Sequence, residues 1–150
     1  MLPPAPPRVE ETVDPEVAHA AVGRYFDAIR AFDMEAWVGT FHPEATMEDP
    51  VGSRPHRGLA ELRVFFQGVM RTFARLDVRP GPLEVRGAQA TARWRAEGTA
   101  YNGRPVVFEG TEQFDLAPDG RILAVRVWWD PAVLVDQLLA EPAPTGAAPA

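Results

Sequence analysis

The hydrophobic pattern of this chain changes its period close to Arg75, and this change restricts the folds that the chain can adopt. Before Arg75, apolar residues recur every three or four positions, which is typical of amphipathic helices. After it, apolar and polar residues alternate, which is typical of strands with one buried face. The alternating segments cover residues 76–80, 83–87, 90–103, 105–116 and 121–129. Helices followed by a run of strands predict an α+β domain.

The first predicted helix has a clear start. Asp14 is a suitable N-cap, and Pro15 suits the first helical position because its missing N–H is not needed there. Apolar residues then continue at helical spacing as far as Phe32. The elements expected next are a second helix over 34–41, a short strand over 45–49 and a third helix over 59–70, opened by Gly58.

Two short sequences predict how the strands are joined. YNGR at 101–104 and PDGR at 118–121 are typical of hairpin turns, because glycine accepts the positive φ that such turns require. Strands joined by hairpins form antiparallel sheets. We therefore expect a cone-shaped, curved antiparallel sheet packed on three N-terminal helices, with a pocket at the open end of the cone.

The 150 residues suffice for one domain with one core. Both ends are rich in proline and alanine, so we expect disordered tails at 1–13 and 140–150 around a single domain at 14–139. No apolar run approaches the roughly 20 residues of a membrane span, and the first residues lack the basic and apolar parts of a signal peptide. These features predict a cytoplasmic protein that does not bind membranes.

Composition also narrows the classes of function. The chain has no cysteine, which excludes disulfides, thiolate nucleophiles and thiolate-bound metals. The formal net charge is −6 without a basic cluster, which argues against nucleic acid as a partner. His19, His42 and His56 are widely spaced, so we expect no metal site and no other cofactor.

Strand alternation separates the adjacent acids of the segment ATMEDPV at 45–51. Asp49 shares one face of the predicted strand with Ala45, Met47 and Val51, whereas Glu48 lies on the other face. The apolar neighbours mark the first face as the inner one. Asp49 is therefore expected to point into the core and Glu48 to point towards water.

The same argument places a second acid, Glu112, among apolar residues of the segment 105–116. It shares a face with Val106, Phe108, Phe114 and Leu116. Burial disfavours a charged carboxylate and raises its pKa, which would make Glu112 a hydrogen-bond donor. Alternation alone equally allows an edge strand from which Glu112 reaches solvent. Tyr25 lies on the apolar stripe of the first helix, where a tyrosine is commonly core packing whose hydroxyl needs a partner.

The motif EDPVGS at 48–53, followed by a proline, a glycine and a helix, resembles the bacterial steroid Δ5-3-ketosteroid isomerases. These enzymes belong to a wider family similar to nuclear transport factor 2 and SnoaL. The resemblance continues through RYF at 24–26, YNGR and GRILAVRVWW at 120–129. It implies the cone-shaped fold, a homodimer formed through the outer face of the sheet, and an apolar small-molecule ketone as the ligand.

The resemblance also implies roles for the three inward residues. Asp49 would be the general base that moves a proton between two carbons near a ketone, without a metal. Tyr25 and Glu112 would donate hydrogen bonds to the ketone oxygen, with Glu112 kept protonated. The residues expected to line the apolar slot for the substrate are Phe26, Phe41, Phe66, Val106, Phe108, Phe114 and Trp129.

This chain departs from the isomerase pattern in three places, which keeps other functions open. Glu112 stands where the family usually has the shorter Asp, and Phe66 stands where isomerases often have a supporting tyrosine. The segment VWWDP at 127–131 places Trp129 where it would narrow the pocket and Asp130 where it would add an acid at the rim. The alternatives are a SnoaL-like polyketide cyclase, an epoxide-opening relative, or a protein that only binds an apolar ligand. Epoxide-opening relatives pair the motif's Asp with an acid on the following helix, where this chain has Gln67.

Overall fold

The computed structural model describes residues 12–140, and residues 1–11 and 141–150 of the tails predicted at 1–13 and 140–150 lie outside this range. The helices are α1 (Pro15–Arg30), α2 (Met34–Val38), α3 (Gly58–Thr72) and α4 (Pro131–Leu139). The strands are β1 (Phe41–Glu48), β2 (His56–Arg57), β3 (Phe73–Pro80), β4 (Glu84–Arg86), β5 (Gln89–Ala100), β6 (Pro105–Leu116) and β7 (Ile122–Trp128).

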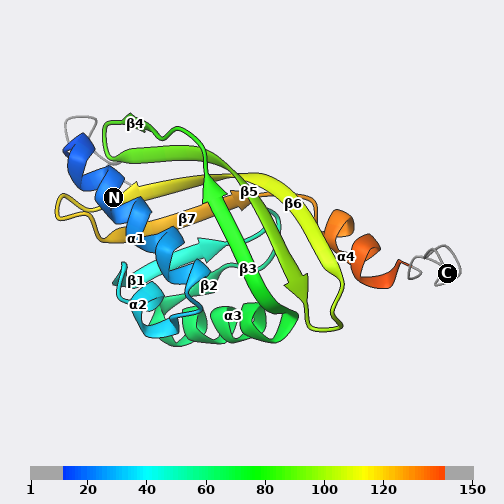
Figure 1. Cartoon of the computed structure of the whole chain (residues 1–150). Helices are drawn as coiled ribbons and strands as arrows, with labels where there is room; N and C mark the ends of the chain where they lie inside the picture. Colours follow the sequence, from blue (N-terminus) through cyan, green and yellow to red (C-terminus); the bar gives the residue numbers. More distant parts are fainter. Residues whose placement is uncertain (1–11, 141–150) are drawn as a thin grey trace, which may run out of the picture.

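The predicted α+β cone is confirmed, with the sheet curving around the three N-terminal helices (Figure 1). The order of the strands is β2-β1-β7-β6-β5-β3, and β4 pairs with β5. The expectation of an antiparallel sheet is wrong at one place, because β1 runs parallel to β7, with Met47 opposite Val125. No hairpin can make this contact, since a parallel pair needs a crossover, and here most of the chain lies between the two strands. The sheet is therefore mixed.

The local signals act as expected at the start of α1 and in the hairpins. The Asp14 side chain accepts a hydrogen bond from the backbone N–H of Glu16, at 2.8 Å. Gly103 and Gly120 have φ of 84° and 91° in the two hairpin loops. The second helix is shorter than predicted, since α2 ends at Val38 and Phe41 already belongs to β1.

The described part of the chain extends beyond the predicted domain at its N-terminal side. Val13, which we assigned to the tail, is buried, and its N–H donates to the carbonyl of Gly87 at 3.0 Å. Helix α4 was not predicted at all. Asp130 caps it by accepting from the N–H of Ala132 at 3.0 Å, and Pro131 opens it.

Helix α4 lies beside the first part of β6 (Figure 1), where the side chain of Gln137 pairs with the strand. Strand β7 ends opposite Thr111, so it does not reach the first residues of β6. The amide of Gln137 fills this place. Its Oε1 accepts from the N–H of Val107 at 2.8 Å, and its Nε2 donates to the carbonyl of Val107 at 2.7 Å. This pairing holds α4 beside β6, with Leu134 buried.

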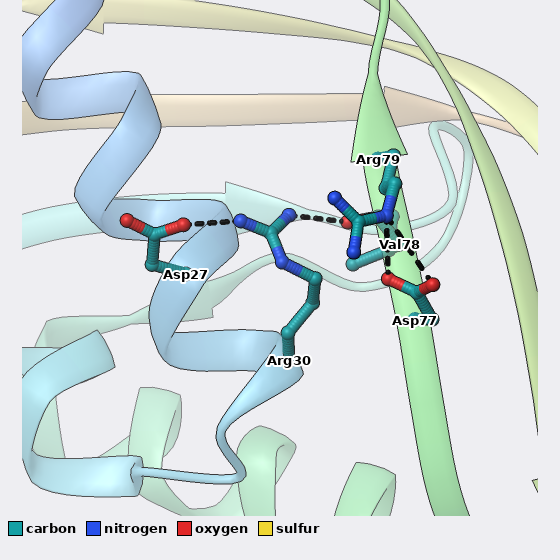
Figure 2. Close-up of polar contacts among 5 residues, drawn as sticks. All are labelled: Asp27, Arg30, Asp77, Val78 and Arg79. Atoms are coloured by element: carbon teal, nitrogen blue, oxygen red, sulfur yellow. Dashed lines mark hydrogen bonds and ion pairs between the residues drawn. The ribbon is translucent and has the colours of Figure 1, made fainter.

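Helix α1 is fixed to the edge strand β3 by Arg30 (Figure 2). The Arg30 guanidinium donates to the carbonyl of Val78 at 2.7 Å and also pairs with Asp27 on its own helix. Figure 2 shows the neighbouring pair of Asp77 and Arg79 on the same strand. The contact between Arg30 and Val78 adds to the packing of the buried face of α1, which carries Tyr25.

The outer face of the sheet carries the residues that alternation assigned to it. Val107, Arg93 and Arg95 are exposed there, and Thr111 and Gln113 are half-buried. The homodimer expected through this face stays a prediction. Among residues 12–140, no helix is long and apolar enough to cross a membrane.

Candidate active site

A cavity of about 400 Å³ lies between the concave face of the sheet and helices α1, α3 and α4. This volume is within the range of small-molecule binding sites. Val64 on α3 lines the cavity and is also exposed, so the cavity opens to solvent beside that helix. Asp49, Tyr25 and Glu112, the three predicted catalytic residues, all line it.

Asp49 follows directly after β1, and its carboxylate accepts a hydrogen bond from Trp129, the residue that follows β7. The indole Nε1 of Trp129 donates to Asp49 Oδ1 at 2.6 Å. Gly110 on β6 makes this contact possible, because a Cβ there would lie 2.9 Å from the Cβ of Trp129 and 2.5 Å from the carbonyl oxygen of Trp128. Only glycine at position 110 leaves room for the Cβ of Trp129 beside β6.

Glu112 is buried, at 4% exposed, on a strand in the interior of the sheet. This excludes the alternative that it reaches solvent from an edge strand. The hydroxyl of Tyr25 donates to Glu112 Oε1 at 3.3 Å. Glu112 Oε2 has no hydrogen-bond partner within the described residues. The 3.3 Å separation is long for a hydroxyl donor, so this bond costs little to exchange for a better acceptor.

The ring of Tyr25 is held in place by other aromatic side chains. Phe114 meets it nearly edge-on at a centroid distance of 5.0 Å, and Phe41 does so at 6.0 Å. Edge-on aromatic pairs of this kind add stability beyond the burial of their area. The hydroxyl of Tyr25 is therefore directed towards Glu112 by a rigid support.

Burial changes the protonation of all three groups. It raises the pKa of Asp49 to about 6, partly opposed by the hydrogen bond from Trp129. Burial, followed by the negative charge of Asp49, raises the pKa of Glu112 well above its usual range. Burial and the two neighbouring carboxyl groups raise the pKa of the Tyr25 hydroxyl. Near neutral pH the cavity thus contains one ionised carboxylate, Asp49, and two protonated donors.

Of the seven residues expected to line the apolar slot, four line this cavity: Phe26, Phe66, Phe108 and Trp129. The other three lie elsewhere. Phe41 and Phe114 pack behind Tyr25, and Val106 is buried in the core. Alternation distinguishes the inner face of a strand from its outer face. It does not distinguish an inner residue that faces a cavity from one that faces solid core.

Two features of the site were not predicted from the sequence: the contact of Trp129 with Asp49 and the position of His56 in the cavity wall. The contact between Trp129 and Asp49 joins residues 80 positions apart, and no local pattern indicates it. His56 also lines the cavity, from the two-residue strand β2, which is too short to show any alternation. Within residues 12–140, no group of three or more His, Asp or Glu side chains is arranged to hold a metal ion.

Fold and cavity together define a class of protein, a curved α+β cone that encloses an apolar, acid-lined cavity. The sequence model of the SnoaL-like domain matches residues 22–125. The chain therefore belongs to the SnoaL-like family, which shares its fold with nuclear transport factor 2.

A relative in Nocardioides simplex is named "Steroid Delta-isomerase". It is 32% identical to this chain over 117 residues, which cover 77% of this chain and 92% of the relative. This similarity supports membership of a catalytic family.

Solved structures share the fold. SalBIII, described as an epoxide hydrolase/cyclase-like enzyme with a role in pyran ring formation in the polyether salinomycin, is 29% identical, with a TM-score of 0.72. The match covers 80% of this chain and 95% of SalBIII. A structure from Jannaschia sp. CCS1, described as a "Putative SnoaL-like polyketide cyclase", has a TM-score of 0.75 at 20% identity. That match covers 92% of this chain and the whole of the other chain. At this low identity the second likeness shows the fold alone.

Proposed function

We propose that this protein is a cofactor-independent isomerase of the steroid Δ-isomerase type, acting on an apolar ketone with a nearby carbon–carbon double bond. Asp49 is the general base, and Tyr25 and Glu112 form the oxyanion hole. The similarity to the Nocardioides simplex relative supports this assignment.

The observation that carries the proposal is the state of Glu112. It is a buried carboxyl with a raised pKa, and its Oε2 has no hydrogen-bond partner among the described residues. A protonated carboxyl in this position offers one unused O–H donor next to the Tyr25 hydroxyl. Two preorganised donors side by side suit a negatively charged oxygen that develops during a reaction.

The chemistry follows from this division of labour. Ionised Asp49 takes a proton from the carbon next to the ketone, and the electrons of that C–H bond form a dienolate. The negative charge moves onto the ketone oxygen, where Tyr25 and Glu112 hold it. Asp49 then returns the proton to the carbon two positions along, which restores the ketone and moves the double bond. A pKa of about 6 suits this task, because Asp49 is mostly ionised at neutral pH yet basic enough to accept a proton.

A second candidate is the opening of an epoxide with ring closure, suggested by the 29% identity to SalBIII. The same acid and base would be used differently, with Glu112 protonating the epoxide oxygen and Asp49 activating a hydroxyl. The α3 residues that line the cavity carry no carboxyl group, and Gln67 is exposed. The acid that epoxide-opening relatives place on this helix is thus missing here, which favours the isomerase.

The decisive experiment uses equilenin, a phenol that mimics the dienolate. We expect the wild-type protein to bind it tightly, and we expect Tyr25→Phe and Glu112→Gln each to weaken binding by about tenfold or more, because a hydrogen bond to a charged oxygen contributes about 1.5–3 kcal/mol. Titration of the phenol fluorescence measures this. Glu109→Gln, an exposed carboxyl on the opposite face of β6, is the matched control.

Binding that is insensitive to both changes would sink the oxyanion hole. Tight binding of equilenin without turnover of any β,γ-unsaturated ketone would instead favour a protein that only binds its ligand.

A further inference from the structure

His56 is a cavity residue that the proposed reaction does not use. Strand β2 pairs antiparallel with β1, and His56 lies opposite Met47. Cross-strand partners share a face, and Met47 is buried two positions before Asp49. His56 therefore lies on the inner face of the sheet, opposite the end of β1 that Asp49 follows. Both side chains line the same cavity.

The ring of His56 is held by packing, but its two nitrogens have no hydrogen-bond partner among the described residues. It packs edge-on against Phe65 of α3, at a centroid distance of 5.1 Å and an angle of 62°. His19 and His42 each use Nδ1 in a contact with a nearby backbone group. No such contact involves either ring nitrogen of His56 among residues 12–140. A donor and an acceptor thus remain available on a ring whose position is fixed by an aromatic neighbour.

The cavity wall has two other unpaired nitrogen atoms among the described residues, the buried indole Nε1 atoms of Trp37 and Trp94, and each of them can only donate. The hydroxyl of Thr72 is already bonded to the carbonyl of Gly68, at 2.8 Å. Phe65, Phe66 and Val69 present only carbon. A ligand oxygen on this side of the cavity would have His56 as its partner, whereas a purely apolar ligand would leave the imidazole unpaired against carbon. Leaving a polar group unpaired costs binding energy, so such a site selects for an oxygen.

We propose that His56 determines substrate specificity by hydrogen bonding to a second oxygen of the substrate. The substrate class is then an apolar, ring-containing ketone that carries a further hydroxyl, carbonyl or carboxylate group on the side facing β2. The inference rests on the proposed function in one respect: Tyr25 and Glu112 hold the first oxygen and so fix which end of the ligand meets His56.

The test compares phenols that differ by one oxygen. The reference probe is 2-naphthol. The other probes are naphthalene-2,6-diol, naphthalene-2,7-diol and 6-hydroxy-2-naphthoate, which carry an oxygen on the far ring. At least one of them should bind the wild-type protein about tenfold more tightly than 2-naphthol does, as one good hydrogen bond allows. In His56→Leu this gain should disappear, while the affinity for 2-naphthol itself should stay the same or rise, because leucine leaves no polar group unpaired beside an apolar ring.

Two further variants complete the design. His56→Gln keeps a donor and should retain part of the gain, and His19→Leu removes an exposed histidine and should retain all of it. The inference is overturned if the gain survives in His56→Leu, or if no oxygenated probe binds more tightly than 2-naphthol. Tyr25→Phe separates this result from the proposed function, because loss of 2-naphthol binding there supports the oxyanion hole whatever His56 does.

Discussion

The cavity has two acidic regions that look alike in sequence and differ in structure. At its floor, Glu112 is 4% exposed on an interior strand and contacts a phenol. At its side, Asp49 follows the end of a strand, keeps partial contact with solvent and accepts from an indole N–H at 2.6 Å. Burial raises both pKa values, but only that of Asp49 remains near 6.

The difference between the floor and the side gives the two carboxyl groups different protonation states. A carboxyl that is shielded from solvent and accepts only a long hydrogen bond from a phenol stays protonated. It can then donate to a negatively charged oxygen of a substrate. A carboxyl with some solvent and a charge-stabilising donor ionises near neutral pH, and it can remove a proton. Under the proposed function, two residues with the same functional group thus act as acid and base because their surroundings differ. The predictions below test this division, starting with the largest expected effect.

Asp49→Asn should abolish most turnover while ligand binding persists. General bases contribute about 10²–10⁴ in rate, so we expect kcat to fall by that factor. Asparagine is nearly isosteric and can still accept from Trp129, so the affinity for equilenin should change by no more than about threefold. Steady-state kinetics on a β,γ-unsaturated ketone and fluorescence titration provide the two readouts. Comparable loss of both would show that Asp49 supports the structure rather than the reaction.

The same variant should be more stable than the wild type at neutral pH. The folded-state pKa of Asp49, about 6, lies above its unfolded value near 3.9, so its contribution to stability is present below pH 4 and is lost as pH rises to about 6. Asparagine does not ionise and escapes this loss. We expect a gain of up to about 2–3 kcal/mol at pH 7.5 and almost none at pH 4, measured by urea unfolding. A gain that is equal at both pH values would contradict burial as the cause.

Glu112→Gln should be milder than Glu112→Ala. Glutamine keeps a neutral donor of similar size, and a weaker donor should lower kcat by about tenfold. Alanine removes the donor and should lower kcat by about 10²–10³, as loss of an oxyanion-hole donor does elsewhere. If the two variants are equally impaired, the ionised form of Glu112 matters and the assignment of the floor as an acid is wrong.

Trp129→Phe should have the smallest effect and should be visible mainly in the pH profile. The indole hydrogen bond lowers the pKa of Asp49, so its removal should shift the acid limb of kcat/KM upwards from about pH 6. A hydrogen bond to a charged group contributes about 1 kcal/mol more than one to a neutral group, so activity at pH 6 should fall by about three- to fivefold. At pH 8 the wild type and the variant should converge. A uniform loss at every pH would indicate a packing defect.

Much of the fold and the key acids could be predicted from the sequence, because both depend on local patterns. Alternation correctly placed Asp49 and Glu112 among buried neighbours, since a strand has only two faces. The parallel pairing of β1 with β7 could not be predicted, because it depends on the closure of the whole sheet. The position of His56 in the cavity could not be predicted either, because β2 has only two residues and shows no alternation.

Helix α4 is different, because the sequence does contain the residues that mark its start. Asp130 and Pro131 repeat the arrangement of Asp14 and Pro15 that identified α1. The contact between Trp129 and Asp49, by contrast, left no trace in the local pattern. It depends on the space above Gly110, which only the folded sheet reveals.

The two side chains that fasten helices to the sheet have a consequence for the behaviour of this protein at high concentration. Arg30 occupies the outward carbonyl of Val78 on the edge strand β3, and Gln137 occupies both backbone groups of Val107 where β7 no longer covers β6. Unpaired backbone groups on such edges would otherwise template a strand from another molecule. We therefore expect the contacts that hold α1 and α4 also to hinder edge-to-edge pairing of the sheet at these two places.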